Sequence, residues 1–422
     1  METPTDYRRP YRPLPVALFN RAGRIGRRLG FGDRLDIGRM IAAAKRRTGL
    51  RDFGDEWFLQ PLDVLVRSIN REARLTPLGM RIQRSRIVSA LSTRLRVERL
   101  LRERPKILEA DLGKVIVIAG LQRTATTTLH RLIAADSRVR ALRSWESLSP
   151  VPLPGERPGD PRRRMREAKR AAAAIGFLAP DFLAIHPVRY DAPEEEIFLL
   201  DLSFMSQSPE AMMHVPNYSR WLEGRDHTKC YEYMLTLLRV LHWQRPGDLW
   251  VLKTPHHMEH LDVVLDVLPG ACIVQTHRDP KRSIPSFLSM VAHGRGILSD
   301  HVDPEEIGAH WMRKTLRMME RSIAVRSTAG AGAFVDVSYR DLVADPIGEL
   351  RRVYEAAEIR FTREAEMTAK ALSARDVKNR HGRHVYSPAG FGLDDETIDR
   401  ACAFYRREYH IPDERAPLRR DG

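Results

Sequence analysis

The sequence predicts an α/β fold in which a parallel β-sheet is flanked by helices on both faces. From residue 114 onward, short runs of apolar and β-branched residues alternate with stretches of helical character; these runs are residues 115–119, 249–252, 271–276 and 333–337. Short apolar runs of this kind are typical of strands that are buried on both faces of a parallel sheet. Ligands of such a sheet bind at the carboxyl ends of its strands. We therefore expect the functional site at that edge.

The rest of the chain is predicted to add helices to this sheet. Its 422 residues exceed the usual size of one compact core. Residues 1–110 lack strand-like runs and interleave apolar residues with arginines, which predicts a helical N-terminal extension. Residues 111–422 are predicted to form the α/β domain. Between its first two strands lies an insertion at about 145–245, in which we expect helices near residues 162–177 and 229–244.

The amino-acid composition limits the classes of partner and the cellular location that we expect for the protein. Lysine and arginine together number 70 against 55 aspartate and glutamate residues, and the net charge of +15 favours an anionic partner: nucleic acid, acidic lipid or a highly charged cofactor. No apolar run approaches the roughly 18 residues that a membrane-spanning helix needs, which excludes an integral membrane protein. Three cysteines and an N-terminus without the apolar core of a secretory signal predict a cytoplasmic location.

A tight loop follows the first predicted strand and leads into a helix. Its residues are Gly120, Leu121, Gln122, Arg123, Thr124, Ala125, Thr126, Thr127 and Thr128. The backbone amides, the positive end of the helix and the threonine hydroxyls of such a loop would bind a phosphate, and Arg123 adds a fixed charge. The alternative is a threonine-rich start of a core helix. The loop lacks the G-x-x-x-x-G-K-[ST] pattern, which disfavours ATP or GTP hydrolysis.

This loop resembles the 5′-phosphosulfate loop of the sulfotransferases that use 3′-phosphoadenosine 5′-phosphosulfate (PAPS), in which a basic residue precedes x-G-T-T. The resemblance implies the P-loop NTPase-like sulfotransferase fold. It also implies that the cofactor is bound by Gly120, Arg123, Thr124, Ala125, Thr126, Thr127 and Thr128. The chain has Ala125 where the family usually has glycine. If this position has a positive φ, we expect Ala125 to strain the loop by roughly 1 kcal/mol.

A second strand end carries further matches to this family. Arg278 follows the strand at 271–276, and Ser286 lies eight residues later. In the family, an arginine and a serine at this separation bind the 3′-phosphate, a role that suits a bidentate guanidinium. Tyr339 begins a segment similar to the family's Tyr-x-Asp-Leu, whose tyrosine lies against the adenine, and residues 378–384 resemble a basic loop that closes over the nucleotide. Considered alone, the arginine also fits an ion-paired helix start and the tyrosine an ordinary half-buried ring.

Three candidates compete for the base that takes the proton of the acceptor hydroxyl. Glu146 lies close to where a catalytic glutamate follows the phosphate loop in the carbohydrate-type sulfotransferases. His256 follows Lys253 in a segment that resembles the Lys-Thr-His of the cytosolic sulfotransferases with one residue inserted. The third candidate is a carboxylate among Glu194, Glu195 and Glu196. Arg123, by resemblance, would stabilise charge on the leaving oxygen, and Lys253 is a further catalytic candidate.

Sulfuryl transfer needs no metal, and we expect none. The residues His256, His257, Glu259 and His260 include two histidines at i and i+4, a spacing that suits zinc on a helix. The segment lacks the H-E-x-x-H order, and the sequence identifies no third ligand nearby.

The sequence therefore predicts a sulfotransferase that moves a sulfuryl group from PAPS to a hydroxyl of a glycan or a hydrophobic alcohol. One alternative is a P-loop phosphoryl-transfer enzyme, against which the missing Gly-Lys-Ser/Thr counts. Another is a non-catalytic basic module that binds nucleic acid or a membrane. For the enzyme we expect no nucleic acid partner, whereas the basic region 1–110 is compatible with peripheral membrane contact. The pattern does not choose an oligomeric state.

Overall fold

The computed structural model describes residues 6–29, 34–157, 159–180, 182, 189–375 and 387–414, and it confirms the predicted α/β fold. Within these residues, parallel strands form a five-stranded sheet in the order β2-β3-β1-β4-β5. The strands are β1 Lys114–Ile118, β2 Val139–Ala141, β3 Leu249–Lys253, β4 Cys272–His277 and β5 Phe334–Ser338. Strand β2 was not predicted from the sequence, because a strand of three residues is too short to form a recognisable apolar run.

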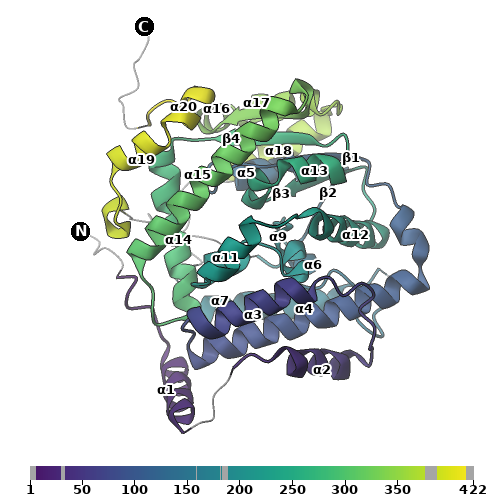
Figure 1. Ribbon diagram of the computed structural model, residues 1–422. Helices are drawn as coiled ribbons and strands as arrows, with labels where there is room; N and C mark the ends of the chain where they lie inside the picture. The colour runs from purple at the N-terminus through teal and green to yellow at the C-terminus, as the bar shows by residue number, and fades with distance from the viewer. Residues whose placement is uncertain are drawn as a thin grey trace.

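Each face of the sheet packs against its own set of helices (Figure 1). Ile116 and Ile118 of β1 belong to one apolar cluster, whereas Val115 and Val117 belong to another, because successive side chains of a strand point to opposite faces. The first cluster lies under α5 Thr126–Ile133, α16 Tyr339–Ala344, α17 Pro346–Ala356 and α18 Arg363–Arg375. The second cluster extends into α12 Thr228–Gln244, α13 Leu261–Val267, α14 Pro280–Leu298 and α15 Pro304–Thr328. Burial on both faces explains why apolar residues dominate the central strands β1 and β3.

The helices nearest the site begin at well-defined caps. Asp279 follows β4, and its carboxylate accepts a hydrogen bond from the backbone N–H of Lys281 at 3.0 Å, while Pro280 occupies the first helical position of α14. Ser338 ends β5 and accepts from the backbone N–H of Arg340 at 3.2 Å, which starts α16. These short connections place both helices directly at the carboxyl edge of the sheet.

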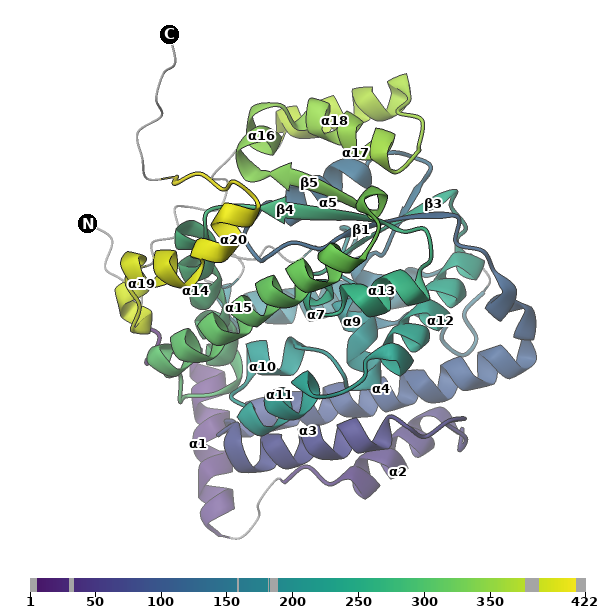
Figure 2. The same cartoon turned by 45° about the horizontal axis from the view of Figure 1, so that its top comes forward.

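The N-terminal helices share the core of the α/β part. They are α1 Leu14–Arg28, α2 Ile37–Thr48, α3 Leu59–Glu72, α4 Pro77–Glu103 and the short 3-10 helix η1 Pro105–Glu109. Leu62, Leu91 and Leu95 are fully buried in the same apolar cluster as Trp250 and Leu252 of β3. Figure 2 shows these helices on the side of the molecule opposite to α16, α17 and α18. Burial of their apolar faces therefore depends on the rest of the chain.

The insertion between β2 and β3 is helical, and short elements complete the chain. The insertion contains α6 Ser144–Leu148, α7 Arg162–Leu178, α9 Ile197–Leu200, η2 Asp201–Ser203, α10 Ser208–Met212, α11 Pro216–Glu223 and α12. The helices expected near 162–177 and 229–244 correspond to α7 and α12. The remaining elements are η3 Pro255–Glu259, η4 Ala331–Ala333, η5 Pro388–Phe391, α19 Asp395–Ala401 and α20 Ala403–Glu408. Among the described residues, no helix has both the length and the apolar character to cross a membrane.

Candidate active site

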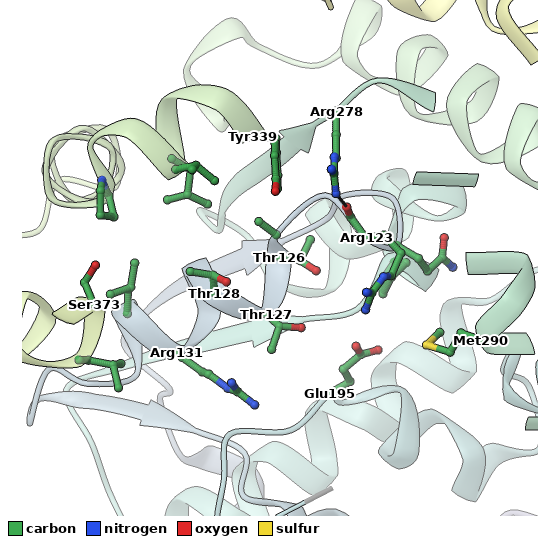
Figure 3. A pocket seen from close by; sticks show the side chains of 18 residues that line it. Arg123, Thr126, Thr127, Thr128, Arg131, Glu195, Arg278, Met290, Tyr339 and Ser373 are labelled. Carbon is green, nitrogen blue, oxygen red and sulfur yellow. Dashed lines mark hydrogen bonds between the residues drawn. The ribbon is translucent and has the colours of Figure 1, made fainter. Parts of the chain in front are cut away.

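A cavity of about 420 Å³ lies at the carboxyl edge of the sheet, where the fold predicts a site. Segments that follow β1, β3, β4 and β5 contribute to its walls (Figure 3). Polar and charged residues around it are Gln122, Arg123, Thr126, Thr127, Thr128, Arg131, Glu195, Arg278, Tyr339 and Ser373. Ala125, Pro255 and Met290 are among its apolar residues.

The loop after β1 is tied to the neighbouring strand β4. A Cβ atom at Gly120 would lie 2.0 Å from Oγ1 of Thr276, so only glycine fits there. The Thr124 hydroxyl donates to the carbonyl oxygen of Leu121 at 2.6 Å and lies 2.6 Å from Oγ1 of Thr276. Gly120 and Thr124 are both buried and do not line the cavity. In the structure, these two residues, which were predicted to bind the cofactor, fix the shape of the loop.

Two residues of this loop have a left-handed backbone. The φ angles are 68° at Arg123 and 70° at Ala125. For residues other than glycine, this conformation costs roughly 1–2 kcal/mol each. The contacts of Arg123 hold it in place: its carbonyl oxygen accepts from Nη1 of Arg278 at 3.0 Å, and its Nε donates to Oγ of Ser286 at 3.0 Å. As a result, Thr127 and Thr128 at the start of α5 line the cavity (Figure 3).

Arg278 lies beside the loop at the end of β4 and has three kinds of contact (Figure 3). Its guanidinium carbon is 3.8 Å from the ring centroid of Tyr339, which is a cation–π contact. Its Nη1 binds the loop, as described above. Its Nε and Nη2 pair with the carboxylate of Glu414 at 3.0 and 3.1 Å. Ser286, which the sequence assigned to the same phosphate, is buried and instead orients the side chain of Arg123.

Glu195 is the carboxylate that lines the cavity. Its side chain is 21% exposed and pairs with the ammonium group of Lys253, at the end of β3. Figure 3 shows it directed into the cavity between Arg123 and Arg131. Its neighbour Glu196 is fully buried: one carboxylate oxygen accepts from the backbone N–H of Lys253 at 2.8 Å, and the other lies 2.6 Å from Nε2 of His257. Because Glu196 is fixed in the core, the preceding residue, Glu195, is held at the cavity.

Glu194, the remaining candidate of the acidic segment 194–196, does not line the cavity. Burial raises the pKa of Glu194, and the negative charge of Glu195 adds to the shift. Its backbone N–H donates to the carbonyl oxygen of Leu142 at 2.9 Å, which ties the segment to the chain that follows β2. Of the three glutamates, only Glu195 lines the cavity.

Glu146 does not line the cavity. Its carboxylate forms a bidentate ion pair with Arg140 at 2.7 and 2.9 Å and accepts from the backbone N–H of Arg143 at 2.8 Å. Both side chains of the ion pair are buried, and burial lowers the pKa of Arg140 to about 10 even though the Glu146 carboxylate opposes this shift. The geometry assigns Glu146 to a buried ion pair at the start of α6, which argues against the predicted role as base.

His256 is also absent from the cavity walls, although the adjacent Pro255 contributes to them. Its side chain is buried, and among the described residues neither ring nitrogen has a hydrogen-bond partner. Burial lowers its pKa well below the ordinary value, and the neighbouring histidines His227 and His257 add to this shift. The imidazole of His256 is therefore enclosed in the core and does not reach the lining of the cavity.

The structure supplies the third histidine that the sequence did not identify. The ligand atoms of His227, His256 and His260 lie within 4.8 Å of one another, and all three side chains are buried. The ring planes of His227 and His260 are stacked, with centroids 3.7 Å apart, whereas zinc ligands must point their in-plane nitrogens at one centre. This ring arrangement disfavours a metal there. Burial is the main cause that lowers the pKa of all three histidines, which keeps them neutral in the core.

Some cavity residues were not predicted. Arg131 lies one helical turn after Thr127 on α5, so the helical repeat alone could have indicated that it faces the same side. Met290 on α14 and Ser373 on α18 carry no local signal, because only packing brings their helices to the sheet edge. The basic segment 378–384 lies outside the described residues.

Comparisons with known proteins agree with this architecture. The profile of the sulfotransferase family matches residues 115–363. Two curated relatives, the omega-hydroxy-beta-dihydromenaquinone-9 sulfotransferases Stf3 of Mycobacterium bovis and Mycobacterium tuberculosis, are 23% identical over 257 residues, which cover 57% of this chain and 61% of theirs. The match thus spans less than two thirds of these relatives.

Solved structures resemble the chain over most of its length. Sulfotransferase STF1 of Mycobacterium tuberculosis is 30% identical with a TM-score of 0.77, and the match covers 88% of this chain and 99% of that one. Sulfotransferase STF9 of Mycobacterium avium is 26% identical with a TM-score of 0.80, and the match covers 89% of this chain and 97% of that one. Since the family profile also matches the segment from β1 through the phosphate loop to β5, this chain belongs to the sulfotransferase family.

Proposed function

We propose that this protein is an enzyme that transfers a sulfuryl group from PAPS to a hydroxyl group of an acceptor. The observation that carries the proposal is one cavity that joins the phosphate loop, three arginines and the carboxylate of Glu195. The arginines are Arg123, Arg131 and Arg278. Membership of the sulfotransferase family supports the same reaction.

The residues around the cavity fit a polyanionic nucleotide. The amides in the first turn of an α-helix have no acceptor within the helix and suit a phosphate. In α5 they belong to Thr126, Thr127 and Thr128, all of which line the cavity. Arg123 and Arg131 add positive charge on this side. Arg278 and the ring of Tyr339 form the wall that we assign to the 3′-phosphoadenosine part. The loop has no lysine at the position that serves nucleoside triphosphates, which supports PAPS over ATP.

Glu195 is the base in this proposal. Its carboxylate would accept the proton of the acceptor hydroxyl, and its ion pair with Lys253 fixes its position for that transfer. When bound, the donor would supply an activated sulfuryl group, whose bond to the phosphate oxygen breaks as the bond to the acceptor oxygen forms. Arg123 stabilises negative charge at the phosphate loop during this exchange. No residue of the proposed site requires a metal.

We propose a hydrophobic alcohol, rather than a glycan, as the acceptor. Met290 lies near Glu195 at the cavity (Figure 3), and Pro255 provides a second apolar wall. The Stf3 relatives are named for a long-chain hydroxylated menaquinone, which belongs to the same class of lipid alcohols. We also propose a cytoplasmic location, which the buried free thiols of Cys230, Cys272 and Cys402 support.

Calorimetric titration with 3′-phosphoadenosine 5′-phosphate (PAP), beside ATP, tests the donor site. We expect PAP to bind selectively over ATP. The variant Arg278→Ala should weaken PAP binding at least about tenfold, and Arg278→Lys should recover only part of the loss, because one ammonium cannot replace a bidentate guanidinium. Arg321→Ala, which removes a surface ion pair with Asp262, is the matched control. Undetectable PAP binding, or magnesium-dependent turnover of ATP, would contradict the proposal.

A further inference from the structure

Helix α1 carries a stripe of exposed apolar side chains. The exposed fractions are 71% for Leu14, 57% for Leu18, 52% for Ile25 and 69% for Leu29, which follows the helix directly. At 100° per residue, these four positions fall within an arc of about 60°. Isolated exposed leucines are ordinary, whereas a continuous row along one helix indicates a contact surface.

The opposite side of α1 is firmly attached to the protein. The carboxamide oxygen of Asn20 accepts from the backbone N–H of Leu78 in α4 at 3.0 Å, and Nη1 of Arg27 donates to the carbonyl oxygen of Leu75 at 3.0 Å. A Cβ atom at Gly23 would lie 2.5 Å from Cβ of Pro77, so the two helices are in close contact. These contacts fix the rotation of α1 and hold the apolar stripe outward.

Positive charge borders this stripe. Arg21, Arg24 and Arg28 are exposed and lie beside it on the helical wheel, and α1 contains no acidic residue. An amphipathic helix with leucine and isoleucine on one face and arginines along its edge is suited to the interface of an anionic bilayer, where the apolar side chains enter the acyl boundary and the arginines meet the head groups. The same charges would repel one another across an interface between two copies of the helix.

Helix α14 connects this stripe to the cavity. Its first half supplies Ser286, which contacts Arg123, and Met290, which lines the cavity. Its end leads to Asp300, which pairs with Arg24 of α1 at 3.2 Å, and Figures 1 and 2 show α14 and α1 in succession along one side of the molecule. α14 therefore spans the distance between the proposed chemistry and the exposed stripe.

A second cavity, of about 300 Å³, lies beside the C-terminal half of α14. Its lining combines aromatic and apolar residues, among them Tyr7, Tyr11, Phe182 and Ile297, with the charged residues Asp6, Arg9 and Arg12 of the N-terminal segment. Met290 and His293 are one helical turn apart, so the two cavities border successive turns of the same helix. Tyr11 in turn precedes the first leucine of the stripe by three residues.

We propose that α1 docks on the surface of an anionic membrane and that the second cavity receives the apolar part of a lipid alcohol whose hydroxyl reaches Glu195. Docking rests on the stripe and its arginines alone. The assignment of the lipid as acceptor rests in addition on the proposed sulfuryl transfer. A protein docked on the membrane through α1 would take its substrate directly from the bilayer, since α14 leads from the stripe to the cavity.

Vesicle flotation of the full-length protein tests the docking. We expect it to float with vesicles of phosphatidylglycerol and phosphatidylcholine at low salt, and to float far less with pure phosphatidylcholine or at high salt, because salt screens the arginines. The double variant Leu18→Glu/Ile25→Glu should lower the bound fraction at least about tenfold, since burying two carboxylates at the interface is unfavourable. Met367→Glu, which changes another exposed apolar residue on α18, is the matched control.

PAP calorimetry on the same double variant separates the two proposals. Unchanged PAP binding with lost flotation supports docking through α1 and leaves the donor site intact. Equal flotation of the double variant and the unmodified protein would overturn the docking proposal. So would a dimer in sedimentation velocity that the double variant dissociates, because the stripe would then be an interface between copies. If the protein floats but binds no PAP, docking stands and the proposed function fails.

Discussion

Two glutamates of the insertion have opposite environments. Glu195 is partly exposed in the cavity and has a single cationic partner, Lys253. Glu146 is buried and satisfies both oxygens with the guanidinium of Arg140 and a backbone amide. A base must reach a proton of the substrate. The location of Glu195 at the cavity therefore favours it as the base, although the spacing from the phosphate loop in the sequence favoured Glu146.

Replacing Glu195 should greatly slow sulfuryl transfer and leave binding at the donor site intact. For Glu195→Gln we expect kcat to fall by about 10²- to 10⁴-fold, because the amide cannot accept the proton, while PAP affinity stays nearly unchanged. Radiolabelled sulfate transfer to a long-chain alcohol and PAP calorimetry measure the two effects. Glu194→Gln, which alters the neighbouring carboxylate that does not line the cavity, is the control. Full activity of Glu195→Gln would eliminate this residue as the base.

Replacing Glu146 should instead lower the stability of the protein. Glu146→Ala leaves the guanidinium of Arg140 buried and without its carboxylate, which we expect to reduce the free energy of unfolding by about 3–5 kcal/mol. Urea denaturation measures this loss, and activity per folded molecule should be retained. If the variant kept its stability but lost most of its kcat, the result would support Glu146 as the base.

The pairing of Arg278 with Glu414 should compete with the donor. The carboxylate occupies Nε and Nη2 of the guanidinium that we assign to the 3′-phosphate. Glu414→Gln should therefore tighten PAP binding by several-fold, since it removes a charge that the phosphate must displace. Calorimetry at low salt is the measurement, and Glu408→Gln, an exposed change on α20, is the control. Weaker binding in Glu414→Gln would show that the carboxylate helps to position the arginine.

At the scale of elements, the loop between β1 and α5 combines a tight turn with a helix N-terminus. Gly120 allows contact with β4, and the left-handed residues Arg123 and Ala125 then turn the chain into α5. Strain was predicted at Ala125 for the case that its φ is positive, and the φ of 70° meets that condition. The strain lies at the point where the amides of α5 face the cavity.

Glycine at position 125 should relieve this strain. We expect Ala125→Gly to raise the free energy of unfolding by up to about 1 kcal/mol, because glycine adopts a positive φ without a steric penalty. Ala134→Gly at the other end of α5, where φ is −67°, should lower it by about 0.5–1 kcal/mol. Urea denaturation of both variants provides the comparison. A loss of stability in Ala125→Gly would mean that the contacts of the loop already compensate for its backbone.

At the scale of the whole molecule, several histidines are buried in neutral form. Burial lowers the pKa of His130, His256 and His260 well below the ordinary value of 6.5. As the pH falls below about 6.5, the unfolded chain takes up protons that the folded protein does not. The free energy of unfolding therefore decreases below this pH and is unaffected above it.

The stability of the protein should consequently decrease as the pH falls from about 6.5. The slope should reach up to about 1.4 kcal/mol per pH unit for each buried histidine. Urea denaturation at a series of pH values measures the slope, and His256→Gln should reduce it. His301→Ala, which removes an exposed histidine, should leave it unchanged. A flat profile between about pH 7 and pH 5 would contradict this account.

The sequence by itself determined the features that depend on short stretches of chain. The apolar runs predicted four of the five strands, and the order of strand, loop and helix predicted the phosphate loop with Arg123. The resemblance to the sulfotransferase motifs singled out Arg278 and Tyr339, which directly follow β4 and β5, and both line the cavity. These residues meet at one cavity because parallel strands end at one edge of the sheet, so the residues that follow them lie near each other.

Only the tertiary structure decided which side chains reach the cavity. Glu194, Glu195 and Glu196 are consecutive, and their directions depend on the contacts of Glu196 with β3 and η3 rather than on any local repeat. Ser286 shares a helix with Met290, yet the one orients Arg123 while the other lines the cavity. The exposed stripe of α1 has a composition similar to that of the buried helices. Whether the apolar face of a helix is buried depends on the element that packs against it. The sequence of the helix alone does not show which element that is.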